Sequence, residues 1–159
     1  MEQKALSKWL KAVLIGVGLC GLVVYLVIVP GYGASTASLN PEYAHCFWPW
    51  LIFLWGTAVP CYTALVLGWR IAANIGRDRS FSRANAEYLK RIAWLAAFDS
   101  AYFFIGTAAL LLLNMSHPGV TLLSLLVVFA GVAVAVAAAA LSHLVQKAAA
   151  LQEQSDLTR

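Results

Sequence analysis

Charged residues are scarce in this chain. Only 11% of its 159 residues are charged, whereas 62% are hydrophobic. A soluble domain of this length usually carries about a quarter charged residues. The composition therefore excludes an ordinary soluble fold. The few residues outside the long apolar stretches leave no room for a separate soluble domain.

Positive charge is missing from two of the connections between these apolar stretches. Segments 30–46 and 114–119 contain no Lys or Arg. All 11 basic residues instead lie before or within the first turn of the first stretch, between the second and the third, or after the fourth. Because basic residues are retained in short cytoplasmic loops, this pattern predicts a multi-pass protein with both termini in the cytoplasm.

The apolar stretches also predict the fold class. Each is longer than the roughly 18 residues that a helix needs to cross the hydrocarbon core of a bilayer. We expect an all-α protein, a four-transmembrane-helix bundle that forms a single integral membrane domain over residues 1–159. The predicted membrane helices cover approximately residues 9–29, 47–69, 92–113 and 120–145.

Residue sets that would support catalysis or cofactor binding are also missing. Cys20, Cys46 and Cys61 form no Cys-x-x-Cys pair, which argues against thiol–disulfide chemistry. We interpret Cys20 and Cys61, both within predicted spans, as small apolar residues. A haem-binding bundle needs axial histidines inside the membrane, and only His143 lies there. No hydrolase residue set is recognisable, so we expect a non-enzyme without a cofactor.

The net charge of +4 reflects residues at the membrane boundary rather than a nucleic-acid surface. No basic recognition element is present, so direct nucleic acid binding is not expected. Near anionic lipid each basic charge is worth about 1 kcal/mol, which makes the lipid bilayer the first partner. The basic connection 70–91 offers five residues to lipid or to a cytoplasmic partner, namely Arg77, Arg79, Arg83, Lys90 and Arg91.

Local signals predict where the helices extend beyond the membrane. Gly76 predicts the end of a lengthened second helix, because glycine readily adopts the left-handed conformation found there. Ser82 is a candidate N-cap for the third helix. Good helix formers at 146–154 predict an extension of the fourth helix, followed by a flexible end at 155–159.

Pro60 lies in the middle of the second predicted helix. An internal proline removes one backbone hydrogen bond and crowds the preceding turn, although neighbouring groups can repair the loss in a membrane. Thr57 and Thr63 are near enough in sequence to do so. Two interpretations stay open, a fixed kink that improves packing and a hinge or cavity lining.

Asp99 is the only acidic residue inside a predicted span. Intramembrane carboxyl groups usually face the bundle interior and often mark ion or proton paths. Asp99 and His143 fall in the same half of antiparallel neighbours, so a contact between them, helped by Tyr102 or Ser100, is geometrically feasible. This candidate intramembrane polar site is either a structural clasp or a proton-linked or ligand-binding group.

Small residues recur on two of the predicted helices. Gly131, Ala135 and Ala139 precede His143 at four-residue spacing, and Gly16 and Cys20 form a shorter stripe with Gly18 and Gly21 nearby. Such stripes let membrane helices approach closely. They are expected to build the bundle, with a homo-oligomer seam as the alternative. A metal site from Glu42, His45, Cys46 and His117 is a weaker alternative at the other face, because these residues lie on separate loops.

Short motifs across nearly the whole chain resemble the family known as domain of unknown function 2975, the YoaS-like bacterial membrane proteins. The motifs that carry the resemblance are Leu39-Asn40-Pro41-Glu42, Thr57-Ala58-Val59-Pro60, Phe81-Ser82, Leu89-Lys90 and Asp156-Leu157-Thr158. Each is short, but their order and spacing over four spans are specific. The final Arg159 departs from the small apolar residue expected there, which puts a role for the C-terminus in doubt.

The resemblance implies a protein of the bacterial cytoplasmic (inner) membrane. It also implies association with small cytoplasmic helix-turn-helix regulators, without identifying binding residues. The leading hypothesis is therefore a membrane sensor or regulatory partner of such a transcription regulator. The alternative is a small transporter, or a transporter accessory subunit, that uses Asp99, His143 and a hinge at Pro60. A scaffold without a ligand is a third interpretation.

Overall fold

The computed structural model of the protein describes residues 2–158. These residues form long helices and no strand, in the order α1 (Gln3–Val23), η1 (Val24–Ile28), α2 (Val29–Leu39), η2 (Pro41–Cys46), α3 (Phe47–Gly76), α4 (Arg83–Leu112) and α5 (Pro118–Leu157). Four helical stretches are long and apolar enough to cross a membrane, beginning with the continuous rod α1–η1–α2. The predicted four-helix membrane fold is confirmed.

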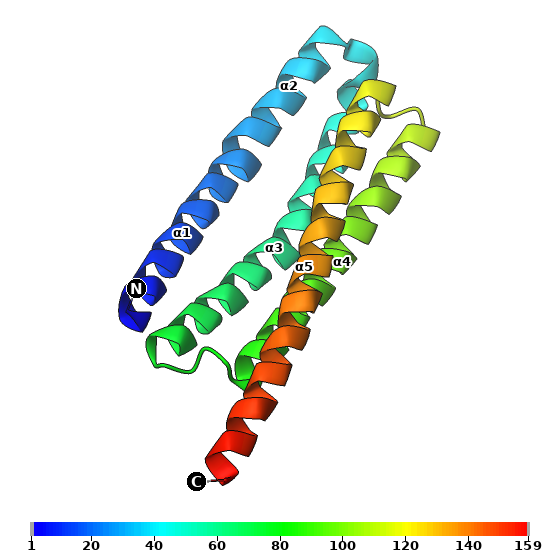
Figure 1. Ribbon diagram of the computed structural model, residues 1–159. Coiled ribbons are helices and arrows are strands. Elements are labelled where there is room, and N and C mark those ends of the chain that lie inside the picture. The colour runs from blue at the N-terminus through cyan, green and yellow to red at the C-terminus, as the bar shows by residue number, and fades with distance from the viewer. Residues whose placement is uncertain (1, 159) are drawn as a thin grey trace.

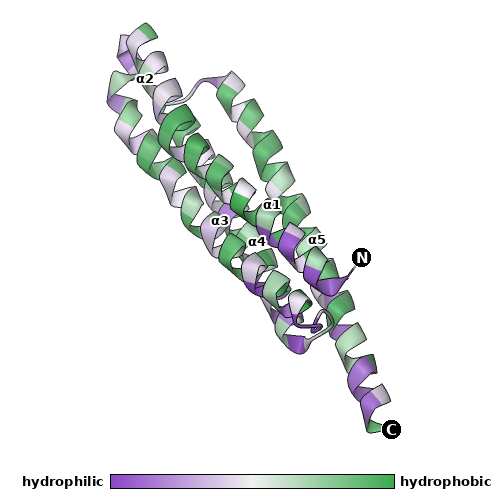
Figure 2. Ribbon diagram, turned by 90° about the vertical axis from the view of Figure 1, so that its left-hand side faces the viewer, coloured by the Kyte–Doolittle hydropathy of each residue, from purple (hydrophilic) through white to green (hydrophobic). Residues whose placement is uncertain are grey.

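The helices run lengthwise beside one another, and both termini lie at the same end of the molecule (Figure 1). Helix α1 packs on α3, α3 on α4, and α4 on α5. Hydrophilic residues gather at the end that holds the termini and the α3–α4 loop (Figure 2). We call it the basic end, because it carries the lysines and arginines of residues 2–158. The opposite end is called the far end.

Apolar side chains cover the outside of the molecule. Phe129 is 74% exposed and Trp94 70% exposed, and many leucines and valines are similarly uncovered. In water such a surface would be unusually apolar, whereas in a bilayer it faces lipid. The exposed surface therefore supports the same assignment as the length of the helices.

The first helical rod is longer than predicted. Segment 30–46 was expected to be a connection, but the helix continues through Pro30 to Leu39. The five residues before α2 form a π-helix, Val24–Ile28. A proline crowds the carbonyl four residues earlier, and a wide π turn relieves this crowding without ending the helix. Reading Pro30 as the end of the first helix was wrong for this reason.

The α3–α4 loop begins and ends where the sequence predicted, but its left-handed residue is a different one. Helix α3 ends at Gly76, as predicted, yet the left-handed residue is Asp78, at φ 60°. Gly76 instead lets α3 approach α1 closely, because a Cβ there would lie 2.8 Å from the hydroxyl oxygen of Ser7 on α1. Ser82 is the N-cap of α4, accepting a hydrogen bond from the amide of Asn85 at 3.2 Å.

Helix α5 extends into the tail, as its composition predicted. It continues to Leu157, so the flexible end expected at 155–159 is wrong for its first three residues. Arg159 lies outside the described residues. The good helix formers at 146–154 carry the helix past residue 155, where the flexible end was expected to begin.

The predicted small-residue stripes are only partly buried. Gly131 lies against Ser100 of α4, but the buried positions that follow are Ala138 and Ser142. Ala139 and His143 are exposed. A contact line with a period of 3.6 residues must mix steps of three and four, so a strict four-residue stripe turns away from its neighbour.

The stripe on α1 faces away from the bundle. Gly16 has no heavy atom within 4 Å of a Cβ built on it, and Cys20 is exposed. Gly18 and Gly21 make the contact instead, both against Tyr62. The expectation that Gly16 and Cys20 build the bundle is therefore wrong, because the contact face of α1 carries Leu14, Gly18 and Gly21 instead.

Candidate functional site

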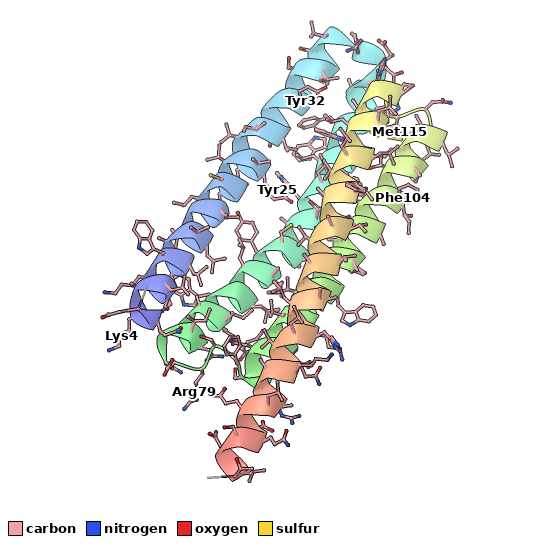
Figure 3. The ribbon with its side chains drawn as sticks, in the orientation of Figure 1. Lys4, Tyr25, Tyr32, Arg79, Phe104 and Met115 are labelled. Carbon is pink, nitrogen blue, oxygen red and sulfur yellow. The ribbon has the colours of Figure 1, made fainter. Side chains whose placement is uncertain are left out.

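Four polar side chains from three helical rods meet within the apolar part of the molecule. Tyr25 comes from η1, Thr57 and Cys61 from α3, and Asp99 from α4. Figure 3 shows Tyr25 directed from the first rod toward α3, where its hydroxyl oxygen lies 2.8 Å from that of Thr57. We call these four residues the polar cluster.

The Asp99 carboxyl group is only half satisfied. Its Oδ2 accepts a hydrogen bond from the thiol of Cys61 at 3.3 Å. Its Oδ1 is buried and has no hydrogen-bond partner among the described residues. A buried polar atom without a partner is costly in an apolar medium. The vacant acceptor position is therefore the place in the cluster where a proton or a cation would be stabilised.

Hydrogen-bond direction in the rest of the cluster follows from the geometry. The Thr57 hydroxyl donates to the carbonyl oxygen of Leu54 at 2.6 Å. That bond uses the only hydroxyl proton of Thr57, so Tyr25 donates to the Thr57 oxygen across the 2.8 Å that separates them. Tyr25 is thereby tied to α3, one turn of helix away from Cys61.

Pro30 and the π-helix explain how Tyr25 is held. The amide of Val29 bonds the carbonyl of Val24, five residues back. In the same register the carbonyl of Tyr25 would need the amide of residue 30, which is proline and has no N–H. The indole N–H of Trp55 supplies the missing donor at 2.8 Å. One tryptophan on α3 thus satisfies the carbonyl that Pro30 leaves free.

Pro60 is buried inside α3, which runs unbroken on both sides of it. The expected repair by threonine is not the one observed. Thr57 bonds Leu54, and Thr63 bonds the carbonyl of Val59 at 2.8 Å. Neither reaches Gly56, whose carbonyl loses its amide partner to Pro60. A role of Pro60 as a hinge stays a prediction.

The expected contact between Asp99 and His143 is wrong. Helices α4 and α5 are antiparallel, and Gly131 lies at the level of Ser100, which follows Asp99. His143 is twelve residues further along α5, about 18 Å nearer the basic end at 1.5 Å per residue. It is exposed there. Tyr102 also points elsewhere, donating to the carbonyl of Phe53 at 3.1 Å.

A second candidate site lies at the basic end and is organised by a buried amide. Asn85 is 1% exposed. Its Oδ1 accepts from Asn74 at 2.8 Å, and its Nδ2 donates to the carbonyls of Arg79 and Ser80 at 3.3 and 3.1 Å. Because one side chain uses its acceptor and both donors on the loop and on α3, the loop is fixed in shape.

An ion pair joins this loop to the end of α5. Arg83 donates from Nε and from one terminal nitrogen to the two carboxylate oxygens of Glu153, at 2.9 and 3.0 Å. Both residues lie beyond the predicted membrane spans, and the guanidinium lowers the pKa of the Glu153 carboxyl by hydrogen bonding. We call residues 77–83 together with the end of α5 around Glu153 the loop–tail surface.

The remaining basic candidates sit on or beside this surface. Arg77, Arg79 and Lys90 are exposed, and Arg91 lies 3.5 Å from Glu87 on its own helix. Their exposure leaves them available to lipid headgroups or to a protein partner.

The residues weighed as a metal site do not converge. Among residues 2–158 no three His, Cys, Asp or Glu side chains are grouped to hold a metal ion. His45 and Cys46 are neighbours, with Nε2 and Sγ 3.4 Å apart. His117 instead caps α5 by accepting from the amide of Gly119 at 2.9 Å. These contacts give His45, Cys46 and His117 local structural roles.

The family described as protein of unknown function (DUF2975) matches residues 31–158. The chain belongs to this family. A curated relative from Bacillus subtilis (strain 168), named uncharacterized membrane protein YoaS, is 29% identical over 152 residues, which cover 94% of this chain and 95% of the relative. No solved structure matches the chain. The resemblance inferred from short motifs is confirmed.

Sequence reasoning found Asp99 in this family member but missed its neighbours. Cys61 was interpreted as an apolar residue, yet its thiol is the donor to Asp99. Tyr25 was not singled out at all. The sequence carried no signal for it, because in an α-helix Pro30 would free the carbonyl four residues earlier, and the five-residue register arises only from the π-helix. Asn85, three residues after the candidate N-cap Ser82, was assigned no role, although its burial makes it the centre of the loop.

Proposed function

We propose that the protein is a regulatory membrane partner without catalytic activity of its own. In this proposal it spans the bacterial inner membrane with its basic end in the cytoplasm, as the distribution of lysine and arginine predicts. A small cytoplasmic protein docks on the loop–tail surface. The partner class suggested by the family resemblance is a helix-turn-helix transcription regulator.

The observation that carries this proposal is the ion pair between Arg83 and Glu153. It marks where the start of α4 meets the end of α5, 70 residues away in the sequence, and the packing of these two helices holds the segments together. Buried Asn85 gives one of these segments a fixed shape. A preformed surface binds a partner at lower entropic cost than two separate flexible segments would. Exposed Arg77 and Arg79 give the surface a positive charge suited to an acidic patch on that partner.

Crosslinking in cells that produce the tagged protein at native level tests the proposal. The double variant Arg77→Ala/Arg79→Ala should abolish capture of a small DNA-binding protein. The matched control, Lys4→Ala/Lys8→Ala, removes two exposed charges from the same end but outside the loop–tail surface. If both variants lose capture equally, only the overall charge of this end matters. If neither loses it, these charges play no part in capture. Either result would show that the proposed surface is wrong.

A second candidate function, ion-coupled transport, is favoured by the vacant Oδ1 of Asp99. An intramembrane carboxyl group that lacks a partner is a common proton or cation site in transporters. In proteoliposomes, Asp99→Asn should abolish coupled flux, while Asp99→Glu should retain part of it. Unchanged flux in the folded Asp99→Asn variant would remove this candidate.

A further inference from the structure

A cavity of about 470 Å³ lies at the far end of the molecule. Its walls come from α2, η2, the start of α3, and the connection between α4 and α5. The aromatic part of the lining is Tyr32, Tyr43, Phe47 and Trp50, and the polar part includes Asn40 and His117. Figure 3 shows Tyr32 on the α2 side of this region and Met115, another lining residue, on the opposite side. The polar cluster and the loop–tail surface share none of these residues.

The cavity exists because α2 is held away from α4 and α5. The first rod packs on α3, and α2 makes no helix–helix contact with α4 or α5. At Gly33 a Cβ would lie 2.6 Å from the ring of Trp50 and 2.9 Å from that of Phe47. These two rings therefore set how closely α2 approaches α3. The centroids of Tyr32 and Trp50 are 6.3 Å apart, so both rings border the same opening.

The lining has aromatic surface and hydrogen-bonding groups but no lysine, arginine, aspartate or glutamate. The connections 30–46 and 114–119 contain no Lys or Arg from which a positive charge could reach the cavity. His117 accepts from the amide of Gly119 through Nδ1, so its neutral ring carries the proton on Nε2 and presents a donor. An anion entering this cavity would lose water without gaining an opposite charge.

We propose that the far-end cavity binds a small uncharged aromatic amphiphile. The rings of the ligand pack against Tyr32 and Trp50, and its hydrogen-bonding group faces Asn40 and His117. A volume of 470 Å³ is within the range of about 300–1,000 Å³ that is usual for small-molecule sites. This inference stands apart from the loop–tail surface and holds whether or not a cytoplasmic partner docks there.

A pair of matched dyes tests both the site and its charge preference. N-phenyl-1-naphthylamine is uncharged, and 8-anilinonaphthalene-1-sulfonate has the same aromatic framework with a sulfonate added. With full-length protein in nanodiscs of zwitterionic lipid, saturable energy transfer from tryptophan to each dye reports binding. We expect the neutral dye to bind at least about tenfold more tightly than the sulfonate, because the cavity offers no counter-charge.

Two variants of α2 locate the binding site. Ala37 lines the cavity, whereas Ala34, one turn away on the same helix, does not. Ala37→Phe fills the cavity and should weaken binding of the neutral dye at least about tenfold, and Ala34→Phe should leave it unchanged. Tyr32→Leu removes one aromatic wall without adding volume and should weaken binding about two- to tenfold.

Three results would overturn the inference. Binding that does not saturate would mean that the dye only partitions into lipid. Equal affinities in Ala37→Phe, Tyr32→Leu and Ala34→Phe would place the dye elsewhere. Sulfonate binding as tight as that of the neutral dye would refute the charge argument. Helix content from circular dichroism confirms that each variant is folded, and Tyr32→Leu decides the outcome if Ala37→Phe does not fold.

Discussion

The tight contact between Gly106 of α4 and Phe53 of α3 predicts a large difference between two identical substitutions. A Cβ at Gly106 would collide with the ring of Phe53, which α3 directs at α4. The ring cannot easily move away. It stacks on Phe103 with centroids 5.9 Å apart and leans on Tyr102 at 5.1 Å. Gly16 is the matched control, because a Cβ there meets nothing within 4 Å.

The magnitude follows from two opposing effects. Replacing a helical glycine with alanine favours folding by about 1 kcal/mol, and both sites receive this gain. Overpacking a tight contact costs about 1–3 kcal/mol, and only Gly106 bears this cost. The free energy of unfolding of Gly106→Ala should therefore be about 1–3 kcal/mol below that of Gly16→Ala, even if Gly106→Ala differs little from the unchanged protein.

Equilibrium unfolding by dodecyl sulfate in mixed micelles, followed by tryptophan fluorescence, measures this difference. Phe53→Leu in the Gly106→Ala background should recover part of the loss, since a smaller side chain makes room for the new methyl group. Equal stability of Gly106→Ala and Gly16→Ala would refute the reasoning. It would mean that α3 and α4 can separate, or the Phe53 ring can move, at little cost, contrary to close packing.

Four further predictions concern other contacts. Trp55→Phe leaves the Tyr25 carbonyl without its donor, and the same unfolding assay should show a loss of about 1–3 kcal/mol, whereas Trp94→Phe, at a side chain 70% exposed, should show almost none. Thr57→Val removes the hydrogen-bond acceptor of Tyr25 and should lower the free energy of unfolding by about 0.6 kcal/mol, and by about 1.7 kcal/mol at most. A larger loss would mean that Thr57 contributes more than this one hydrogen bond. Asn85→Ala should cost about 1–3 kcal/mol and speed proteolysis of the α3–α4 loop, with exposed Gln152→Ala as the control. Glu153 has a lowered pKa, so its ion pair with Arg83 stabilises the protein above the ordinary glutamate range and is lost as the pH falls through that lowered pKa; carbon NMR should show the pKa of Glu153 returning upward in Arg83→Gln.

Charge distribution and apolar length were sufficient to predict the four helices, since both follow directly from transfer of the chain into a bilayer. The start of α4 was also predictable, because Ser82 acts locally as its N-cap. The end of α3 was predicted at Gly76 for the wrong reason, since the left-handed residue is Asp78 and Gly76 lies against Ser7 of α1. Pro30 was misread because a proline ends a helix in most settings. Here a π turn and the indole of Trp55, 25 residues away in the sequence, compensate for it.

The polar cluster was only partly predictable for a related reason. Asp99 is conspicuous in any apolar span, but its partner depends on which face and which depth of another helix it meets. The assumed pairing with His143 ignored the register of α4 and α5, which Gly131 and Ser142 set through contacts with Ser100 and Ala86. Such contacts depend on helix rotation and relative height, and single residues on one helix do not specify either.

The π-helix at Val24–Ile28 fixes how the two halves of the first rod are turned relative to each other. It accommodates one residue more than an α-helical turn, so a change to the α-helical register would rotate α2 by about 100° relative to α1. Tyr25, in the polar cluster, lies within the π-helix, whereas Tyr32, at the far-end cavity, lies beyond it on α2. A deletion of one residue within the π-helix would therefore change the direction in which Tyr32 points relative to Tyr25. The π-helix thus fixes the rotation of α2 about the helix axis relative to α1.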